Sequence, residues 1–417
     1  MTLPRITAHR AAALALTAAF GLILGMSPSA QAQTFTVLYS FAGYPTDGGK
    51  PGAGLLRDGA GNLYGTTVYG GHNKSCPAAG TGCGTVFELD KHGVETVLHN
   101  FTGPDGANPV ASLMMDAKGD LYGTTRFGGL VKDCTGNGSA GCGVVFELSR
   151  GKETVLHRFT DGTDGAWPWA GLIADAHGNL YGTTNGGGTV GGGVVFKLAG
   201  KKETVLHSFT GGKDGNYLTS GLLMDAAGDL YGTDAFGGDM ECDYPNGCGV
   251  VFKLTGKQLT VLHSFKAPPD GANPVGGMTM DSEGNLYGTT DSGGEDYSTG
   301  TVFKVGATGK EQVLHRFRVN GSDGIYPQTA VVRDAQGNLY GTTEEGGLYG
   351  GGVVYEITAD GKEKILHSFC SGDCSDGGSP SDLIMDAKGN LYGTTYGGGV
   401  NDNGTVFKIT LHPSDAQ

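Results

Sequence analysis

The sequence has few basic residues and no long apolar segment beyond its first residues, and each shortage excludes a class of protein. Lysine and arginine total 28 against 42 aspartates and glutamates, for a net charge of −14, and the acidic residues are spread along the chain. Nucleic acid and anionic membrane are therefore not expected partners. After residue 32 no apolar run reaches the roughly 20 residues that a bilayer requires, so we expect no membrane span in the mature chain.

Motifs of the common enzyme classes are also missing. The chain contains no G-x-S-x-G elbow, no H-E-x-x-H, no Walker loop and no G-x-G-x-x-G between a strand and a helix. The hydrolase, zinc protease and nucleotide-binding activities that depend on these motifs are unsupported.

Glycine dominates what is present. The chain has 79 glycines and 15 prolines among 417 residues. Glycine costs about 1 kcal/mol in a helix interior, so the composition favours strands joined by tight turns and excludes a helical bundle. The glycines do not recur every third residue, which excludes a collagen. Hydrophobic residues at 38%, with 17 Phe and 17 Tyr, indicate a packed core.

The N-terminus has the pattern of an export signal. Arg5 and Arg10 precede an apolar run over residues 11–26, and small residues then lead to a cleavage position after Ala32. We therefore expect residues 1–32 to be a signal peptide and the mature protein to be secreted or periplasmic. A membrane anchor is the alternative, but the run is short for a span and a cleavage site follows it.

One unit is repeated along the rest of the chain. The string Leu-Tyr-Gly-Thr occurs seven times at spacings of 50 to 59 residues. Its tyrosines are Tyr64, Tyr122, Tyr181, Tyr231, Tyr287, Tyr340 and Tyr392. Each copy reads as four short strands, for example over residues 221–224, 230–233, 250–254 and 261–265, and an Asp-x-x-Gly-Asn/Asp turn joins the first two.

Four-stranded units at this period predict a β-propeller, and seven copies predict seven blades in one domain over residues 33–417. The mature chain begins with a fourth-strand sequence, Thr36–Phe41, and ends after a third strand, Phe407–Ile409. We therefore expect the N-terminal strand to complete the last blade and close the ring of a monomeric protein. A parallel β-solenoid is the alternative, but units of about 55 residues with hairpins at both ends fit it poorly.

The repeat resembles a known family. Asp-x-x-Gly-Asn-Leu-Tyr-Gly-Thr-Thr, then Gly-x-Val-Phe-Lys/Glu-Leu and Thr-Val-Leu-His-Ser-Phe, are similar to the GloVer tandem repeat of bacterial surface and secreted proteins, over nearly all of the mature chain. The resemblance implies architecture and compartment, and no activity. The Asp-x-x-Gly-Asn-Leu-Tyr hairpin is also similar to that of NHL-type propeller blades.

All eight cysteines fall in the long connections between strands two and three or between blades. They form sequence-local pairs: Cys76/Cys83, Cys134/Cys142, Cys242/Cys248 and Cys370/Cys374. An even count after a signal peptide predicts four disulfides. Metal binding is the alternative, and neither C-x-x-C spacing nor a histidine cluster supports it.

Two polar residues recur in every repeat or nearly so. A histidine lies in the fourth strand at His99, His157, His207, His263, His315 and His367, with Tyr39 in the first copy. We interpret it as a structural hydrogen-bonding residue, because six equivalents around a ring cannot converge on one substrate. Asp-Gly recurs between blades at Asp47, Asp105, Asp164, Asp214, Asp270, Asp323 and Asp376. We interpret these aspartates as turn formers, and the alternative is a carboxylate ring at the pore mouth that holds calcium.

Residues that depart from the repeat are the candidate site residues. The only tryptophans, Trp167 and Trp169, lie in one inter-blade loop, where exposed rings would form a platform for sugars and where loop packing is the alternative. Asp234 replaces a repeated threonine. Asp291, Glu344 and Glu345 are further candidate catalytic acids. Asp239, Glu241 and Asp243 alternate like the start of a calcium loop, without the glycine and glutamate of an EF-hand, so no cofactor is predicted and calcium is left open.

Two functional hypotheses follow. The first is a non-enzymatic secreted propeller that binds a glycan, peptide or cell-envelope component on its loop-rich face. The second is a polysaccharide lyase or glycoside hydrolase that uses acids on the same face. The fold alone does not choose between them.

Overall fold

The computed structural model describes residues 33–72, 76, 81–129, 134, 141–243 and 245–411. The predicted signal peptide, residues 1–32, lies outside the described residues. Within these ranges the chain is all-β, and no helix is long and apolar enough to cross a membrane.

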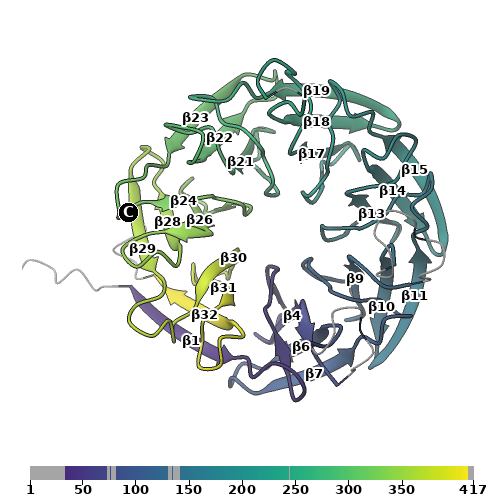
Figure 1. The fold of residues 1–417 in the computed structure, drawn as a ribbon, viewed down its shortest axis with the longest axis vertical. Coiled ribbons are helices and arrows are strands. Elements are labelled where there is room, and N and C mark those ends of the chain that lie inside the picture. Colours follow the sequence, from purple (N-terminus) through teal and green to yellow (C-terminus); the bar gives the residue numbers. More distant parts are fainter. Residues whose placement is uncertain are drawn as a thin grey trace, which may run out of the picture.

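Seven four-stranded antiparallel sheets are arranged as the blades of a propeller (Figure 1). The strands of each blade are given from the innermost outward. Blade 1 is β3 (Leu56–Arg57), β4 (Leu63–Thr67), β6 (Thr85–Leu89) and β7 (Glu95–Asn100), and blade 2 is β8 (Met114–Met115), β9 (Leu121–Thr125), β10 (Val144–Ser149) and β11 (Lys152–Arg158). Blade 3 is β12 (Ile173–Ala174), β13 (Leu180–Thr184), β14 (Val194–Ala199) and β15 (Lys202–Ser208). Blade 4 is β16 (Leu223–Met224), β17 (Leu230–Asp234), β18 (Val250–Thr255) and β19 (Gln258–Ser264). Blade 5 is β20 (Thr279–Met280), β21 (Leu286–Thr290), β22 (Thr301–Val305) and β23 (Glu311–Arg316). Blade 6 is β25 (Val332–Arg333), β26 (Leu339–Thr343), β28 (Val353–Ile357) and β29 (Glu363–Ser368). Blade 7 is β30 (Gly378–Met385), β31 (Leu391–Gly397), β32 (Thr405–Thr410) and β1 (Thr34–Ser40). Two short pairs, β2 (Gly48–Gly49) with β5 (Tyr69–Gly70) and β24 (Gly324–Ile325) with β27 (Glu345–Gly346), lie in the loops.

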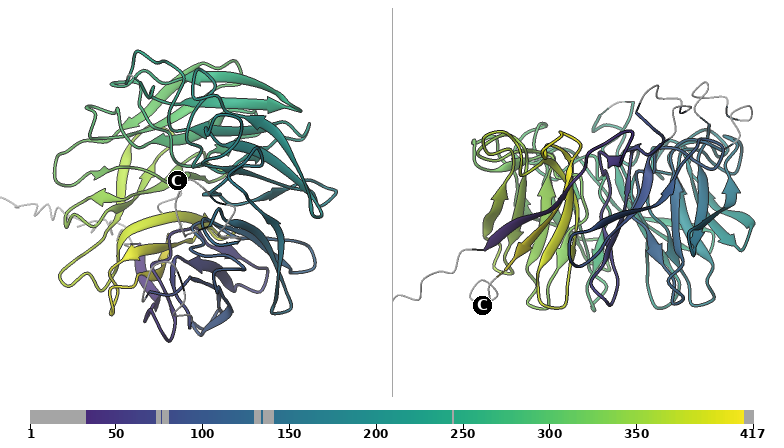
Figure 2. Two further views of the ribbon diagram at one scale, coloured as in Figure 1. Left: turned by 45° about the vertical axis from the view of Figure 1, so that its right-hand side comes forward. Right: turned by 90° about the horizontal axis from the view of Figure 1, so that it is seen from below.

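The predicted closure of the ring is confirmed. β1 pairs antiparallel with β32, with Thr34 opposite Thr410 and Ser40 opposite Thr405. The first and last parts of the described chain therefore lie side by side in blade 7 (Figures 1 and 2).

The glycine of each Leu-Tyr-Gly-Thr string has a packing reason. Gly65 on β4 pairs with Phe87 on β6, and a Cβ on that glycine would lie 2.6 Å from the Phe87 ring. A ring on the third strand covers the second-strand glycine in every blade, so the glycine makes room for the aromatic core. The glycine just before the third strand recurs for another reason: six of its seven copies have a positive φ, as Gly84 does at +91°, which an L side chain rarely adopts.

The cores lie between blades. One cluster joins Val86 and Phe101 of blade 1 to Leu121 and Phe146 of blade 2, and equivalent clusters follow around the ring. The Phe101 and Phe146 rings meet edge to face at 5.2 Å. Each blade is therefore stabilised by its neighbours. A missing strand at any joint, the boundary between two neighbouring blades, exposes apolar surface.

The long connections gather on one face, and the hairpins between the first two and the last two strands lie on the other (Figure 2). The four predicted disulfides are confirmed: Cys76–Cys83, Cys134–Cys142, Cys242–Cys248 and Cys370–Cys374. Each closes a loop on the loop-rich face.

Candidate functional site

A central cavity of about 440 Å³ is lined by all seven blades. Its walls are the segments that lead into the innermost strands, together with Glu344 and Tyr396 from the ends of second strands. In Figure 1 the innermost strands surround this centre. Every blade therefore contributes one wall, and a side chain that differs in one repeat makes that wall different.

At one position of the repeat, blade 7 has an acid where the other six blades have small residues. The residue four places before the hairpin aspartate is Gly54, Ser112, Gly171, Gly221, Gly277, Ala330 or Asp382. Asp382 thus carries the only charge in a ring of small residues, and its Oδ1 accepts a hydrogen bond from the Ala330 backbone at 2.9 Å. Burial raises the pKa of this carboxyl.

Two predicted acids lie beside the same cavity. Glu344 lines it, and the Asp291 carboxylate accepts a 2.9 Å hydrogen bond from Gln328 Nε2, another lining residue. Burial raises the pKa of the Asp291 carboxyl. The Glu344 side chain is exposed, and partial desolvation together with the charges of Glu345 and Asp291 raises its pKa. Glu345 itself is exposed and does not line the cavity.

The two tryptophans have different surroundings. Trp169 lines the cavity, and the Arg126 guanidinium lies 4.0 Å from the centre of its ring and 4.7 Å from that of Phe127. Trp167 packs against the core between blades 2 and 3 and over Gly186. Its backbone has φ of +55°, in the left-handed region. The structure therefore places one ring at the cavity and the other in loop packing.

A tyrosine is the second aromatic residue of the cavity lining. Tyr396 lines the cavity, and burial together with Tyr69 raises its pKa to about 12. Lys50 Nζ lies 5.6 Å from the Tyr396 ring centre and is paired with Asp402 at 3.5 Å. This cation is therefore already engaged outside the cavity.

Asp234 lies inside blade 4 and away from the cavity lining. Its side chain is fully buried, the Phe236 backbone donates to Oδ1 at 3.2 Å, and Oδ2 has no hydrogen-bond partner within the described residues. Burial raises its pKa well above the usual value. The threonine at this position in other blades donates its hydroxyl to the carbonyl two residues later, as Thr184 does to Gly186.

We expect Asp234→Thr to stabilise the protein. Threonine would restore the hydroxyl donor and remove an unpartnered buried oxygen, a gain of about 1–3 kcal/mol in the free energy of unfolding at neutral pH. Because the raised pKa of Asp234 makes its penalty largest above that pKa, the gain should shrink at acidic pH. Denaturant unfolding at both pH values measures it. Thr184→Asp in blade 3 is the reciprocal control and should destabilise, and an unchanged midpoint for Asp234→Thr would contradict this account.

The proposed calcium-loop residues do not converge. Asp239 Oδ1 accepts from the Glu241 backbone at 3.1 Å and Asp243 from the Asn246 side chain at 3.4 Å, which are loop contacts. Among the described residues, the groups of three whose ligand atoms lie within 4.8 Å of one another are His263/Asp270/Glu311 and His315/Asp323/Glu363. Asp239, Glu241 and Asp243 belong to neither.

The repeated histidines and aspartates meet at the joints between blades. His99 Nε2 lies 3.1 Å from Asp105, and the equivalent distances at the other histidines run from 3.0 to 3.8 Å. At the closing joint Tyr39 donates to Asp47 at 2.8 Å. Each aspartate also accepts a backbone N–H of its own loop, as Asp105 does from Thr102 at 2.7 Å. The turn-forming and structural interpretations therefore hold, and these aspartates lie against the outer strands, so they form no ring at the pore mouth.

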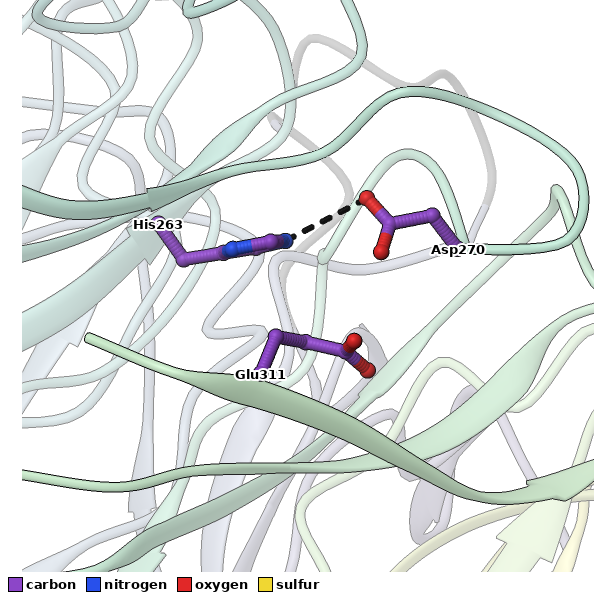
Figure 3. Close-up of side chains that lie close together, drawn as sticks. All are labelled: His263, Asp270 and Glu311. Carbon is purple, nitrogen blue, oxygen red and sulfur yellow. Dashed lines mark hydrogen bonds and ion pairs between the residues drawn. The ribbon is translucent and has the colours of Figure 1, made fainter.

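A glutamate completes five of these joints, and sequence reasoning missed it. Glu311, from the fourth strand of blade 5, faces His263 and Asp270 of the preceding joint (Figure 3). The five are Glu95, Glu153, Glu203, Glu311 and Glu363, and in each one Oε1 is buried without a hydrogen-bond partner in the described part of the chain. Burial raises the pKa of Glu95 and of Glu311 to about 7 and that of Glu363 to about 8. The signal was present, since each glutamate lies four residues before the repeated histidine or its equivalent.

Fold and cavity define a seven-bladed β-propeller with an acidic, aromatic-lined centre. The chain belongs to the Gloeobacter/Verrucomicrobia repeat family, whose model matches residues 15–136, 134–335 and 318–417. The expected membership of a GloVer-type tandem-repeat family is thus confirmed. No curated protein matches the sequence.

Several solved structures share the fold. Virginiamycin B lyase from Staphylococcus aureus is 12% identical, with 91% of this chain and 100% of that chain covered and a TM-score of 0.56. A streptogramin B lyase is 14% identical, with 91% and 98% covered and a TM-score of 0.57. The extracellular domain of a putative hybrid two-component system from B. thetaiotaomicron is 14% identical, with 92% and 42% covered and a TM-score of 0.52. At these identities the likeness concerns the fold alone.

Proposed function

We propose that this propeller is an exported protein that binds a carbohydrate in its central cavity, on the loop-rich face. The observation that carries the proposal is the placement of Trp169 on a cavity wall opposite polar side chains. An indole ring offers an apolar face to a sugar ring, while amide and carboxylate oxygens accept hydrogen bonds from its hydroxyl groups.

The size and chemistry of the cavity support this proposal. At about 440 Å³ it falls in the range of small-ligand sites, and it contains Gln328, Glu344 and Asp382 as polar groups and Trp169 and Tyr396 as aromatic ones. The Arg126 guanidinium, stacked on the indole, limits the rotamers of Trp169. A preorganised ring loses little entropy when a ligand packs on it.

Export is supported by the four local disulfides and by the signal-like N-terminal sequence. Disulfides persist in oxidising compartments, outside the cell or in the periplasm. Edman sequencing of the protein recovered after expression with residues 1–32 tests this part, because cleavage after Ala32 is the expected result.

Trp169→Ala tests the binding site. A glycan array on the mature protein would identify ligands, and titration calorimetry would then give their affinity. We expect the substitution to weaken binding about tenfold, because ring stacking on an aromatic side chain contributes about 1–2 kcal/mol. Tyr297→Ala is the matched control, since that ring is 66% exposed on a blade 5 loop away from the cavity. Equal affinity of Trp169→Ala and the unchanged protein would remove the cavity from the proposal.

A polysaccharide lyase or glycoside hydrolase is the second candidate, and Asp382 is the observation that favours it. A partly buried carboxyl with a raised pKa beside further acids is a common arrangement for a general acid. Reducing-end and unsaturated-product assays on the glycans that bind would detect turnover, and Asp382→Asn should abolish it. Binding without turnover would leave the first candidate alone.

A further inference from the structure

The charged residues that line the central cavity are all acidic. Its lining residues include two acids, Glu344 and Asp382, and no lysine, arginine or histidine among the residues that the structure describes. A third acid, Asp291, lies one hydrogen bond behind Gln328. None of the three carboxyls is in an ion pair with a described basic residue.

These acids occupy successive blades. Asp291 follows the second strand of blade 5, Glu344 that of blade 6, and Asp382 lies on the first strand of blade 7. No three acid or histidine ligand atoms among the described residues of the cavity come within 4.8 Å of one another. Spaced carboxylates of this kind suit hydrogen-bond donors distributed along an extended ligand better than a single metal ion.

One cation lies close to Trp169 without lining the cavity. Arg126 follows the second strand of blade 2, and its guanidinium lies over the rings of both Phe127 and Trp169 but is not among the lining residues. The rest of the chain adds to the acidic potential, with a net charge of −14. A positively charged ligand would therefore be attracted to the cavity and would meet carboxylates on blades 5 to 7.

We propose that the cavity selects an amino sugar, with the sugar ring on Trp169 and its ammonium group toward Asp382 and Glu344. The inference rests on the proposed carbohydrate binding and adds the charge of the ligand. An ammonium group supplies three N–H donors to carboxylates that lack a cationic partner, and a charge-assisted hydrogen bond is stronger than a neutral one. Desolvation raises the pKa values of both cavity acids, and a bound ammonium group would stabilise their charged forms.

A matched pair of ligands tests the charge directly. Glucosamine oligomers and N-acetylglucosamine oligomers of equal length share a backbone and differ in whether the amine is charged. Titration calorimetry of the mature protein near neutral pH should give glucosamine oligomers about tenfold tighter binding. Equal affinity for the two, or a preference for the acetylated oligomer, would overturn the inference and leave carbohydrate binding in place.

Variants separate charge recognition from structural damage. Asp382→Asn and Glu344→Gln should each reduce affinity for glucosamine oligomers several-fold more than they reduce affinity for the acetylated oligomer. Glu241→Gln, an exposed acid outside the cavity with the same change in net charge, should alter neither. If Asp382→Asn weakens both ligands equally, the carboxylate has no role in charge selection. If neither oligomer binds and the array shows only neutral or acidic glycans, the inference fails while the proposed function stands, and an empty array rejects both.

Discussion

A mature chain that lacks residues 33–41 should fail to form a cooperative native state, and a synthetic peptide of those residues should restore it. The segment supplies β1, the outer strand of blade 7, which pairs with β32 from Thr34 to Ser40 with one bulge. It also supplies Phe41, which is fully buried in a cluster with Phe87 of blade 1 and Val406 of blade 7. Removal would expose the edge of β32 and one wall of that core together.

The size of the effect follows from the side chains lost. Phe35 stacks on His367 at 3.7 Å, and truncating a buried Phe such as Phe41 to Ala typically costs about 3–5 kcal/mol. Most single domains are stable by only about 5–15 kcal/mol, so losing the whole strand should remove most of the stability. Circular dichroism and denaturant unfolding of the deletion, with and without the peptide, measure this.

Point variants on β1 provide the control. Phe41→Ala should lower the unfolding free energy strongly, whereas Thr36→Ala, at an exposed position on the same strand, should change it by less than about 0.5 kcal/mol. A deletion variant that unfolds at the same denaturant concentration as the mature chain would show that the ring does not depend on its N-terminal closure.

The architecture was accessible from the sequence because every blade repeats it. Seven copies of one hairpin signal specify the strands, and the mismatch between a leading fourth strand and a missing final one specifies the closure. The disulfides were equally readable, because each pair is local and its loop is an insertion. Because each element recurs in several copies, its assignment in one copy can be checked against the others.

The cavity was harder to predict because it is a property of the ring. Asp382 is unremarkable along the chain, and it matters only because the equivalent residues of the other blades are small and five of them line the same cavity. The two tryptophans also show that distance along the chain does not predict distance from the central axis. Trp167 and Trp169 are two residues apart, yet a left-handed backbone at Trp167 sends one ring into packing while the other reaches the cavity. Sequence spacing alone cannot supply that radial position.

The joint glutamates lead to a second prediction: the protein should be more stable near pH 5 than near pH 9. Burial raises the pKa of Glu95 and Glu311 to about 7 and that of Glu363 to about 8, from an ordinary value near 4.5. A group whose pKa is raised by folding contributes stability that is complete below the unfolded value and is lost as pH rises through the folded value. The loss should therefore fall between about pH 5 and about pH 9.

Other groups at the joints act in a different window. The pKa values of Asp105, Asp164 and Asp270 lie below the ordinary range, despite burial, because histidine and loop hydrogen bonds stabilise the carboxylates. Their contribution is present above the ordinary aspartate pKa and is lost as pH falls below it. Burial also lowers the pKa of His367, which disfavours folding as pH drops below about 6.5 and so limits the gain on the acid side.

One pKa unit corresponds to about 1.4 kcal/mol, and after allowance for partial solvent screening we expect the three glutamates together to contribute about 4 kcal/mol across this range. The combined variant Glu95→Gln, Glu311→Gln and Glu363→Gln keeps the shape of the joints and removes their titration. Its unfolding free energy should fall less between pH 5 and pH 9 than that of the unchanged protein. Glu153 and Glu203, whose pKa burial also raises, remain in this variant and keep part of the slope. Glu241→Gln, an exposed acid outside the joints, should keep the full slope. Two joints serve as internal references, because Leu259 and Phe35 stand where the others have glutamate. If the combined variant retains the slope of the unchanged protein, the pH dependence arises from other groups, and folding does not raise the pKa of these three carboxyls.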